Sequence, residues 1–265
     1  MSLAAHIRPR FQRELTRRIT VGIALIALAL GDIWLGWLYF WALVSLGSIL
    51  MMGEWSDLVK EGYKRRLAQA AITVPLILLA PQAPFPGPSI IVILVFAGMA
   101  GALAIGAQSI RLALGIFYAG LPAVALVFLR ELDFGHEIAM WALSLVWATD
   151  IGAFFVGKSL GGPKIWPAIS PKKTWSGGIG GVLAAIGAGL LFHYFGRLPL
   201  ELALASGLLS VVAQAGDFFE SFLKRRAGVK DSGDLLPGHG GVMDRLDGLV
   251  PVAPLVALLW LWWMM

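Results

Sequence analysis

The chain contains no cysteine and carries little charge. The absence of cysteine excludes both disulfide bonds and thiolate metal sites. Charged residues make up only 14% of the 265 residues and hydrophobic residues make up 58%, whereas a soluble globular protein has about 25% charged and about 45–50% apolar residues. The mean hydropathy is correspondingly high, at +0.79. We therefore expect an all-α integral membrane protein without a soluble domain.

Apolar segments long enough to cross a bilayer recur along the whole chain. A transmembrane helix needs roughly 20 mostly apolar residues, with a range of about 17–25. Nine spans are predicted, at residues 17–31, 33–53, 66–81, 89–108, 111–129, 137–157, 177–196, 199–217 and 249–265. About five of them fall in residues 1–130 and the others in residues 131–265, together with the polar loops, as one continuous membrane domain.

The positions of lysine and arginine predict how these spans are oriented. Cytoplasmic loops of membrane proteins carry an excess of Lys and Arg. If the N-terminus is cytoplasmic and the C-terminus is outside, all of the 21 Lys and Arg residues except Arg130 and Arg197 lie in inward-facing segments. Topology and anionic lipid head groups therefore explain the net charge of +5. Nucleic acid is not expected as a partner, whereas membrane lipids are.

Glycine is abundant, at 32 residues, and is concentrated in the apolar segments. Small residues let transmembrane helices approach closely, so most of these glycines are predicted to serve helix packing within the chain. The same glycine-rich faces make a homodimer plausible. Spacings such as that of Gly177 and Gly181 are too common in apolar segments to specify a partner.

Many of the remaining charges gather in one inward loop, between residues 217 and 247. On a helix, Asp217, Glu220, Ser221 and Lys224 occupy one face, because they are three, four and seven positions apart. At the other end of the loop, two further aspartates, at positions 244 and 247, precede the last span. Carboxylates presented by two helices make an oxygen-rich site that suits Mg²⁺.

A glycine-rich bend separates these two groups of carboxylates. Gly238, Gly240 and Gly241 are predicted to let the backbone fold tightly and to expose N–H groups to an anion. Positive charge for binding phosphate is available at Lys224, Arg225, Lys230 and Arg245. The pattern favours a nucleotide or polyphosphate held through a metal. The alternative is a solvated basic loop that only fixes topology, but topology gives no reason for the aspartates.

His239, inside this bend, has several possible roles. It could ligate a metal, contact phosphate or transfer a proton. The sequence has no second histidine nearby, so a contact with phosphate or substrate is the favoured interpretation.

Two other inward loops contain polar residues that topology does not require. Asp150 lies inside an apolar span, where an unpaired carboxylate is costly, so a functional role is favoured over a structural hydrogen bond. The run 170–174 places hydroxyls and lysines before a predicted helix, which is either an anion site or a basic flank. A further loop, residues 54–64, is interpreted as a solvated amphipathic face, in which Glu54 is the least ordinary member.

These residues resemble a known family. The run from Ser221 to Asp247 resembles, without a gap, the signature of the phosphatidate cytidylyltransferases, also called CDP-diacylglycerol synthases. The Gly216-Asp217-x-x-Glu220-Ser221 segment, the Ser170–Thr174 run and the segment from Asp150 to Gly157 are also similar to the family. Residues 1–110 resemble it mainly as a set of spans. Ser176 departs from the pattern, because relatives often carry an acidic or amide side chain there.

The resemblance implies transfer of CMP from CTP to phosphatidate, with Mg²⁺, alone or together with a second cation, as cofactor. It implies catalytic roles for Asp217, Lys224, Asp244 and Asp247, with the three aspartates as metal ligands. It implies substrate binding by Ser170, Lys172, Lys173, Thr174, Ser221, Arg225, Lys230, His239, Gly240, Gly241 and Arg245. Asp150, Glu220 and Asp231 are assigned to a possible second site. Because CTP is cytosolic and phosphatidate is a lipid, a multi-pass protein of the inner membrane is expected.

Two other functions are less compatible with the sequence. A CDP-alcohol phosphotransferase would carry the run D-G-x-x-A-R, but here Asp247-Gly248 is followed by Leu-Val-Pro-Val. A transporter would place polar residues near the middle of its spans and in paired halves. In this chain they gather at one end of the predicted spans.

Overall fold

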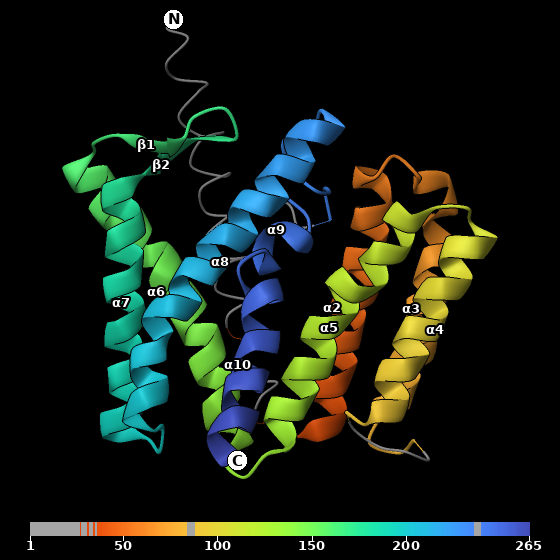
Figure 1. Ribbon diagram of the computed structural model, residues 1–265, viewed down its shortest axis with the longest axis horizontal. Coiled ribbons are helices and arrows are strands. Elements are labelled where there is room, and N and C mark those ends of the chain that lie inside the picture. Colours follow the sequence, from red (N-terminus) through yellow and green to blue (C-terminus); the bar gives the residue numbers. More distant parts are fainter. Residues whose placement is uncertain (1–26, 28–30, 32–33, 35, 84–87, 236–239) are drawn as a thin grey trace, which may run out of the picture.

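The computed structural model describes residues 27, 31, 34, 36–83, 88–235 and 240–265. These residues form a helical protein with one small hairpin (Figure 1). The helices are α2 (Trp37–Leu58), α3 (Arg65–Leu78), α4 (Ile90–Gly106), α5 (Ile110–Glu131), α6 (Gly135–Leu160), α7 (Trp175–Phe195), α8 (Leu200–Ala227), α9 (Met243–Leu246) and α10 (Leu249–Met264). A 3₁₀ turn, η1 (Gly62–Lys64), precedes α3, and strands β1 (Lys164–Trp166) and β2 (Ser170–Thr174) precede α7.

The all-α prediction is confirmed, and each of the eight predicted spans after the first coincides with a helix. The first predicted span, 17–31, lies largely outside the described residues. Within the described part, α2, α5, α6, α7 and α8 are long and apolar enough to cross a membrane, while α4 and α10 are shorter apolar helices. The number of nine transmembrane helices and the orientation of the termini stay predictions.

Polar residues between the apolar segments explain where several helices begin. Ser89 Oγ accepts a hydrogen bond from Val92 N (3.4 Å) at the start of α4, and Ser109 Oγ accepts one from Leu112 N (3.1 Å) at the start of α5. Such side chains satisfy N–H groups that have no partner within the first helical turn. The same device at the start of α7 involves a residue of the candidate site.

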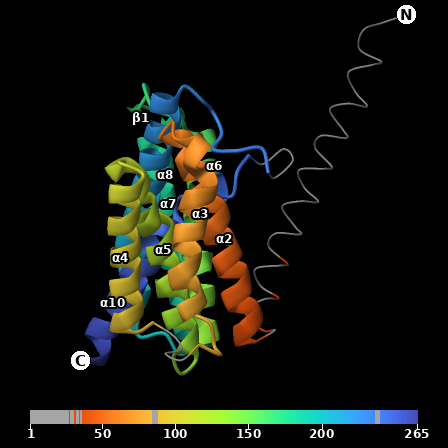
Figure 2. The same ribbon diagram turned by 90° about the vertical axis from the view of Figure 1, so that its right-hand side faces the viewer.

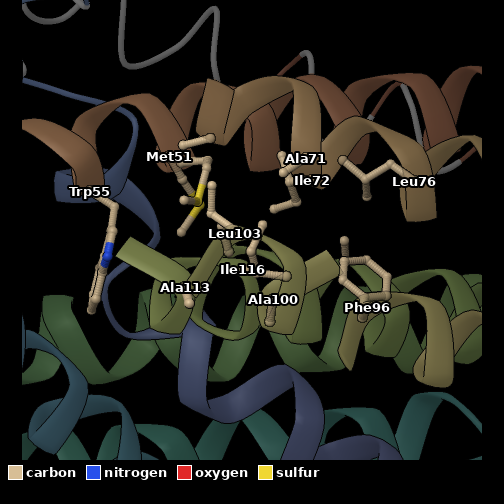
Figure 3. Close-up of a cluster of buried hydrophobic side chains, with 14 of the residues drawn as sticks. Met51, Trp55, Ala71, Ile72, Leu76, Phe96, Ala100, Leu103, Ala113 and Ile116 are labelled. Carbon is tan, nitrogen blue, oxygen red and sulfur yellow. The ribbon is translucent and has the colours of Figure 1, made fainter. Parts of the chain in front are cut away.

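The helices form two groups, with α10 between them (Figure 1). One group comprises α2 to α5, and its core contains Met51, Trp55, Ile72 and Phe96 (Figure 3). The other comprises α6 to α8 around the fully buried Trp141. Helix α10 contacts α5 on one side and α6 and α8 on the other. The last helix therefore joins the two groups into one body.

Glycines bring α6 and α7 into close contact, as the sequence predicts. A Cβ atom on Gly180 would meet the side chain of Val156, and one on Gly181 would lie 2.8 Å from the carbonyl oxygen of Thr149. Any larger residue at these positions would push the two helices apart. These glycines thus serve packing within the chain.

The connections that carry the candidate-site residues and the other predicted inward loops lie at one end of the molecule. The α2–α3 turn, the α4–α5 turn, the β hairpin and the end of α8 are at the upper end in Figures 1 and 2, whereas the C-terminus is at the lower end. The hairpin is antiparallel, with Lys164 opposite Thr174 and Trp166 opposite Ser170. This hairpin occupies a segment for which the sequence predicts only a loop. The loops predicted to face inward therefore share one end of the structure.

Candidate active site

Charged side chains at the polar end form two neighbouring clusters. The first, here called the lysine pocket, is a cavity of about 470 Å³ between α6, the hairpin, the start of α7 and α8. Its polar lining consists of Asp150, Lys158, Lys164, Lys172, Lys173, Thr174, Gln214 and Asp217. The second, here called the Glu54–Asp244 network, joins the end of α2 to the turn before α10.

The lysine pocket is dominated by positive charge. Four lysines line it together with two carboxylates. Lys173 forms an ion pair with Asp217 and lies 4.5 Å from the centre of the Phe218 ring, so its ammonium group has a defined position. Asp150 is exposed to this cavity, which explains how a carboxylate is accommodated in a span. An excess of ammonium groups around a cavity of this size suits a phosphorylated ligand.

The hairpin wall of the pocket depends on the start of α7. Thr174 is buried, and its Oγ1 accepts a hydrogen bond from Gly177 N (3.1 Å), so it caps the helix. Ser176, the position that departs from the family pattern, donates a hydrogen bond to the carbonyl oxygen of Gly161. Gly161 has a φ angle of +62° where the chain leaves α6, a conformation that favours glycine. Thr174 and Ser176 therefore order the pocket wall.

A group of carboxylates lies at the α8 side of the pocket. The backbone of Asp247 packs against α8, because a Cβ atom on Gly216 would meet the Asp247 carbonyl oxygen. Burial raises the pKa of Asp247 to about 7, and the nearby charges of Asp217 and Asp150 add to this effect. Asp217 also accepts a hydrogen bond from Ser221 Oγ at 3.4 Å. Carboxylates from α6, α8 and the turn before α10 thus converge and repel one another.

Lys224 connects α8 to the Glu54–Asp244 network. Its Nζ donates to Asp244 Oδ1 at 2.5 Å and to Glu220 Oε1 at 3.1 Å. The side chains of Glu220 and Asp244 are 0% and 4% exposed, so these are buried ion pairs. Although burial raises the pKa of Asp244, hydrogen bonds from Lys224 and from the Gly241 and Ser232 N–H groups lower it below its usual value. Asp244 is therefore an ionised, well-anchored carboxylate.

Glu54 belongs to the same network, although sequence reasoning assigned it to a solvated face. Its side chain is buried. Its Oε1 accepts from Val242 N (2.8 Å), and its Oε2 accepts from Met243 N (2.8 Å) and Ser232 Oγ (2.9 Å). The signal that could have found it is the position of a carboxylate at the end of an apolar span, where topology gives it no reason to be.

The chain is similar to known proteins along most of its length. Residues 16–263 match the profile of the Cytidylyltransferase family. The chain belongs to this family. The phosphatidate cytidylyltransferase of Brucella suis is 40% identical over 253 residues, which cover 92% of this chain and 93% of the relative. The enzyme of the same name from Pseudomonas aeruginosa is 35% identical over 267 residues, covering 93% and 97%, and that of Bacillus subtilis is 43% identical over 150 residues, covering 55% and 56%. The predicted family is confirmed.

In this cytidylyltransferase, the structure divides the predicted site residues between the two clusters. Asp150, Lys172, Lys173, Thr174 and Asp217 line the lysine pocket. Lys224, Glu220, Asp244 and Gly241 lie in the network, while Ser221 and Asp247 lie beside Asp217. Ser170 is in β2 and does not line the pocket. Their roles in binding and catalysis stay predictions.

The remaining predicted residues have simpler surroundings. Arg225, Lys230, Asp231 and Arg245 are exposed. Arg225 donates to the carbonyl oxygen of its neighbour Val229 at 3.1 Å. His239 lies outside the described residues, so its predicted substrate contact has no structural counterpart here.

The glycine bend uses its N–H groups differently from what the sequence suggested. Gly240 has a φ angle of +78°, and Gly241 N donates to Asp244 Oδ2 at 2.8 Å. The N–H group of Gly241 therefore faces a carboxylate of the chain. In the described part of the bend, Gly240 and Gly241, an internal carboxylate thus takes the place predicted for a phosphate.

A magnesium ion fits the Asp217 side of the site better than the Asp244 side. Among the residues described, no three carboxylate or histidine side chains come together as metal ligands. Mg²⁺, however, is often held by one or two carboxylates together with substrate phosphates. The ion pair of Asp217 with Lys173 offsets only part of the repulsion that Asp247 experiences from Asp217 and Asp150, and a cation would relieve the rest. Asp244, in contrast, is already balanced by Lys224 and by backbone N–H groups. Asp217 and Asp247 are thus the better candidates.

Proposed function

We propose that the chain transfers CMP from CTP to phosphatidate, forming CDP-diacylglycerol and pyrophosphate at the cytoplasmic face of the inner membrane. The observation that carries the proposal is the lysine pocket, which joins four ammonium groups to two carboxylates at the polar end of an otherwise apolar bundle. The names of the relatives agree with this reaction. The basic loops at the same end support a cytoplasmic location.

The proposed reaction is a nucleotidyl transfer. A phosphate oxygen of phosphatidate attacks the α-phosphorus of CTP, and the bond from that phosphorus to the bridging oxygen of pyrophosphate breaks. The lipid phosphate is already ionised at pH 7, so the chain does not need a strong general base. The protein has to position two anions that repel each other and stabilise the charge that develops between them. Mg²⁺ held by Asp217 and Asp247 would neutralise part of the phosphate charge.

The lysines of the pocket are suited to this positioning role. Lys172 and Lys173 project from β2, while Lys158 and Lys164 come from the end of α6 and from β1. Phosphate oxygens placed among these groups would replace the water around them with charge-assisted hydrogen bonds. The ion pair with Asp217 would keep Lys173 directed at the carboxylates where the metal is proposed to bind.

The outer surface of α6 supports a lipid as one of the two substrates. Phe154 lines the pocket and is also 59% exposed. Ile151 and Phe155, on either side of it, are 58% and 60% exposed. A polar cavity that continues into exposed apolar side chains can hold a phosphate inside while acyl chains remain in the bilayer. We therefore assign the lipid phosphate to the α6 side of the pocket.

The decisive experiment is the incorporation of CTP labelled at the α-phosphorus into lipid by the purified protein. Phosphatidate in detergent micelles is supplied with and without Mg²⁺. A labelled lipid that requires both phosphatidate and Mg²⁺ supports the proposal, and no labelled lipid under Mg²⁺ overturns it. A parallel assay with CDP-diacylglycerol and an alcohol acceptor tests the alternative of another lipid-phosphate transferase. The possible homodimer and second cation stay predictions.

A further inference from the structure

Glu54 is a buried carboxylate that the proposed reaction does not use. It lies near the end of α2, in the N-terminal group of helices, and only 3% of it is exposed. Among the described residues, its hydrogen-bond partners are Ser232, Val242 and Met243, which are 178 to 189 residues away along the chain. A buried carboxylate bonded to such distant residues of the active-site segment indicates a specific positioning role.

Glu54 and Asp244 bind the same turn and share one partner, Ser232. The N–H groups of three consecutive residues, 241 to 243, point at these two carboxylates, the first at Asp244 and the other two at Glu54. Ser232 Oγ lies 2.9 Å from an oxygen of each, and Ser232 N donates to Asp244 at 2.8 Å. A hydroxyl has one proton to donate, so Ser232 can serve one of the two carboxylates at a time. Both carboxylates thus hold one turn.

The backbone of the active-site segment packs directly against the Glu54 side chain. A Cβ atom on Gly241 would meet Glu54 Oε2 and Ser232 Oγ, and a Cβ atom on Gly233 would lie 3.1 Å from Glu54 Oε1. The end of α2 is itself fixed, because Trp55 Nε1 donates to the carbonyl oxygen of Arg111 at 2.9 Å. The carboxylate is therefore held in place from α5, through α2, before it binds the turn.

We propose that Glu54 is a positioning residue of the proposed transferase. From α2 it holds Ser232 and the turn at residues 241–243, and so fixes the start of α9, which brings Asp244 to Lys224 and Asp247 to the Asp217 side of the pocket. The inference rests on the proposed function, since it gives the network a task in that reaction. Glu54 itself touches no reacting atom in this scheme.

The test compares two variants and a matched control. Glu54→Gln keeps the size of the side chain, but a neutral amide has one acceptor oxygen and turns an N–H donor toward the backbone N–H groups. Ser232→Ala removes the shared hydroxyl. Glu61→Gln is the control, because Glu61 is a carboxylate at the same end, bonded to Lys64 at 2.8 Å, and outside the network.

Two readouts are measured for each variant. The first is CMP transfer, as kcat, as KM for CTP and as the Mg²⁺ concentration for half-activation. The second is hydrogen exchange of the backbone amides of Val242 and Met243. We expect Glu54→Gln to lower kcat about 10–100-fold, the range typical of residues that orient a catalytic shell, and to speed exchange of both amides. Glu61→Gln should leave both readouts within twofold of the parent protein.

Combining the variants separates positioning from general destabilisation. If Glu54 and Ser232 act as one unit, the double variant loses about as much kcat as the worse single variant, because effects within one unit do not multiply. Multiplying effects overturn the proposal, as does a Glu54→Gln protein that melts at a lower temperature with unchanged kcat. The exchange readout needs no activity. If the Val242 and Met243 amides of Glu54→Gln exchange no faster than those of the parent protein, the inference is overturned, whether or not the parent makes CDP-diacylglycerol. A parent protein that makes no CDP-diacylglycerol overturns only the proposed function.

Discussion

Replacing Lys224 by methionine tests the buried charge balance on which the network depends. The Lys224 ammonium group lies 2.5 Å from Asp244 and 3.1 Å from Glu220, whose side chains are 4% and 0% exposed. Methionine has a similar length but no charge, so two buried carboxylates lose the cation that they share. Removing one partner of a buried ion pair costs about 3–5 kcal/mol, out of a total stability of about 5–15 kcal/mol.

We therefore expect Lys224→Met to lower the free energy of unfolding by about 3–5 kcal/mol and to abolish CMP transfer. Unfolding is followed by denaturant titration in detergent micelles, and transfer by incorporation of labelled CTP into lipid. Adding Glu220→Gln to the same variant removes one of the two unbalanced charges. We expect this second change to restore about 1–3 kcal/mol of stability but no transfer, because the ammonium group is still missing.

Two results would refute this reasoning. A Lys224→Met protein as stable as the parent would show that the ion pairs do not balance buried charge. A double variant no more stable than Lys224→Met alone would show that Glu220 is not the group left unbalanced. Arg66→Met, at an exposed position of α3, is the control for the loss of a positive charge.

Three further predictions concern individual residues. Burial and then the charges of Asp217 and Asp150 raise the pKa of Asp247 to about 7. A ligating carboxylate must be deprotonated, so the Mg²⁺ affinity without substrate should fall about tenfold per pH unit below pH 7 and level off above it. Titration calorimetry that shows the same affinity at pH 6 and pH 8 would contradict this. Gly241→Ala should destabilise the protein by about 1–3 kcal/mol in a thermal melt, because the new Cβ meets Glu54 and Ser232, whereas Gly98→Ala, with open space around it, should not. Lys173→Met should raise the KM of a phosphorylated substrate at least about tenfold, the value of one charge-assisted hydrogen bond, and an unchanged KM for both substrates would remove Lys173 from the proposed site.

The helices were predictable because each apolar segment is bounded by polar or helix-capping residues. Ser89 and Ser109 mark the starts of α4 and α5, where they cap the first turn. The location of the basic loops at one end of the molecule was also predictable. Successive spans run in opposite directions, so every second connection lies at the same end. The β hairpin did not follow, because strands this short depend on cross-strand pairing that only the folded backbone shows.

The residue types of the site were predictable from the sequence, but the division of these residues between the lysine pocket and the Glu54–Asp244 network was not. Asp244 and Asp247 are only three positions apart before the last span, yet the structure pairs Asp244 with Lys224 and places Asp247 beside Asp217. The choice is made by elements far away in sequence, above all by Glu54, whose hydrogen bonds determine where the turn lies. Sequence spacing within one segment contains no information on such partners.

The distance along the chain between Glu54 and its partners has a consequence for biosynthesis. Glu54 leaves the ribosome 178 to 189 residues before Ser232, Val242 and Met243. At a synthesis rate of about 5–20 residues per second, this carboxylate waits roughly 10–40 s at the end of an inserted helix before its acceptor oxygens find donors. During that interval water, lipid head groups or the insertion machinery must donate hydrogen bonds to it. The Glu54–Asp244 network can therefore form only after residues 232–243 have been synthesised, long after α2.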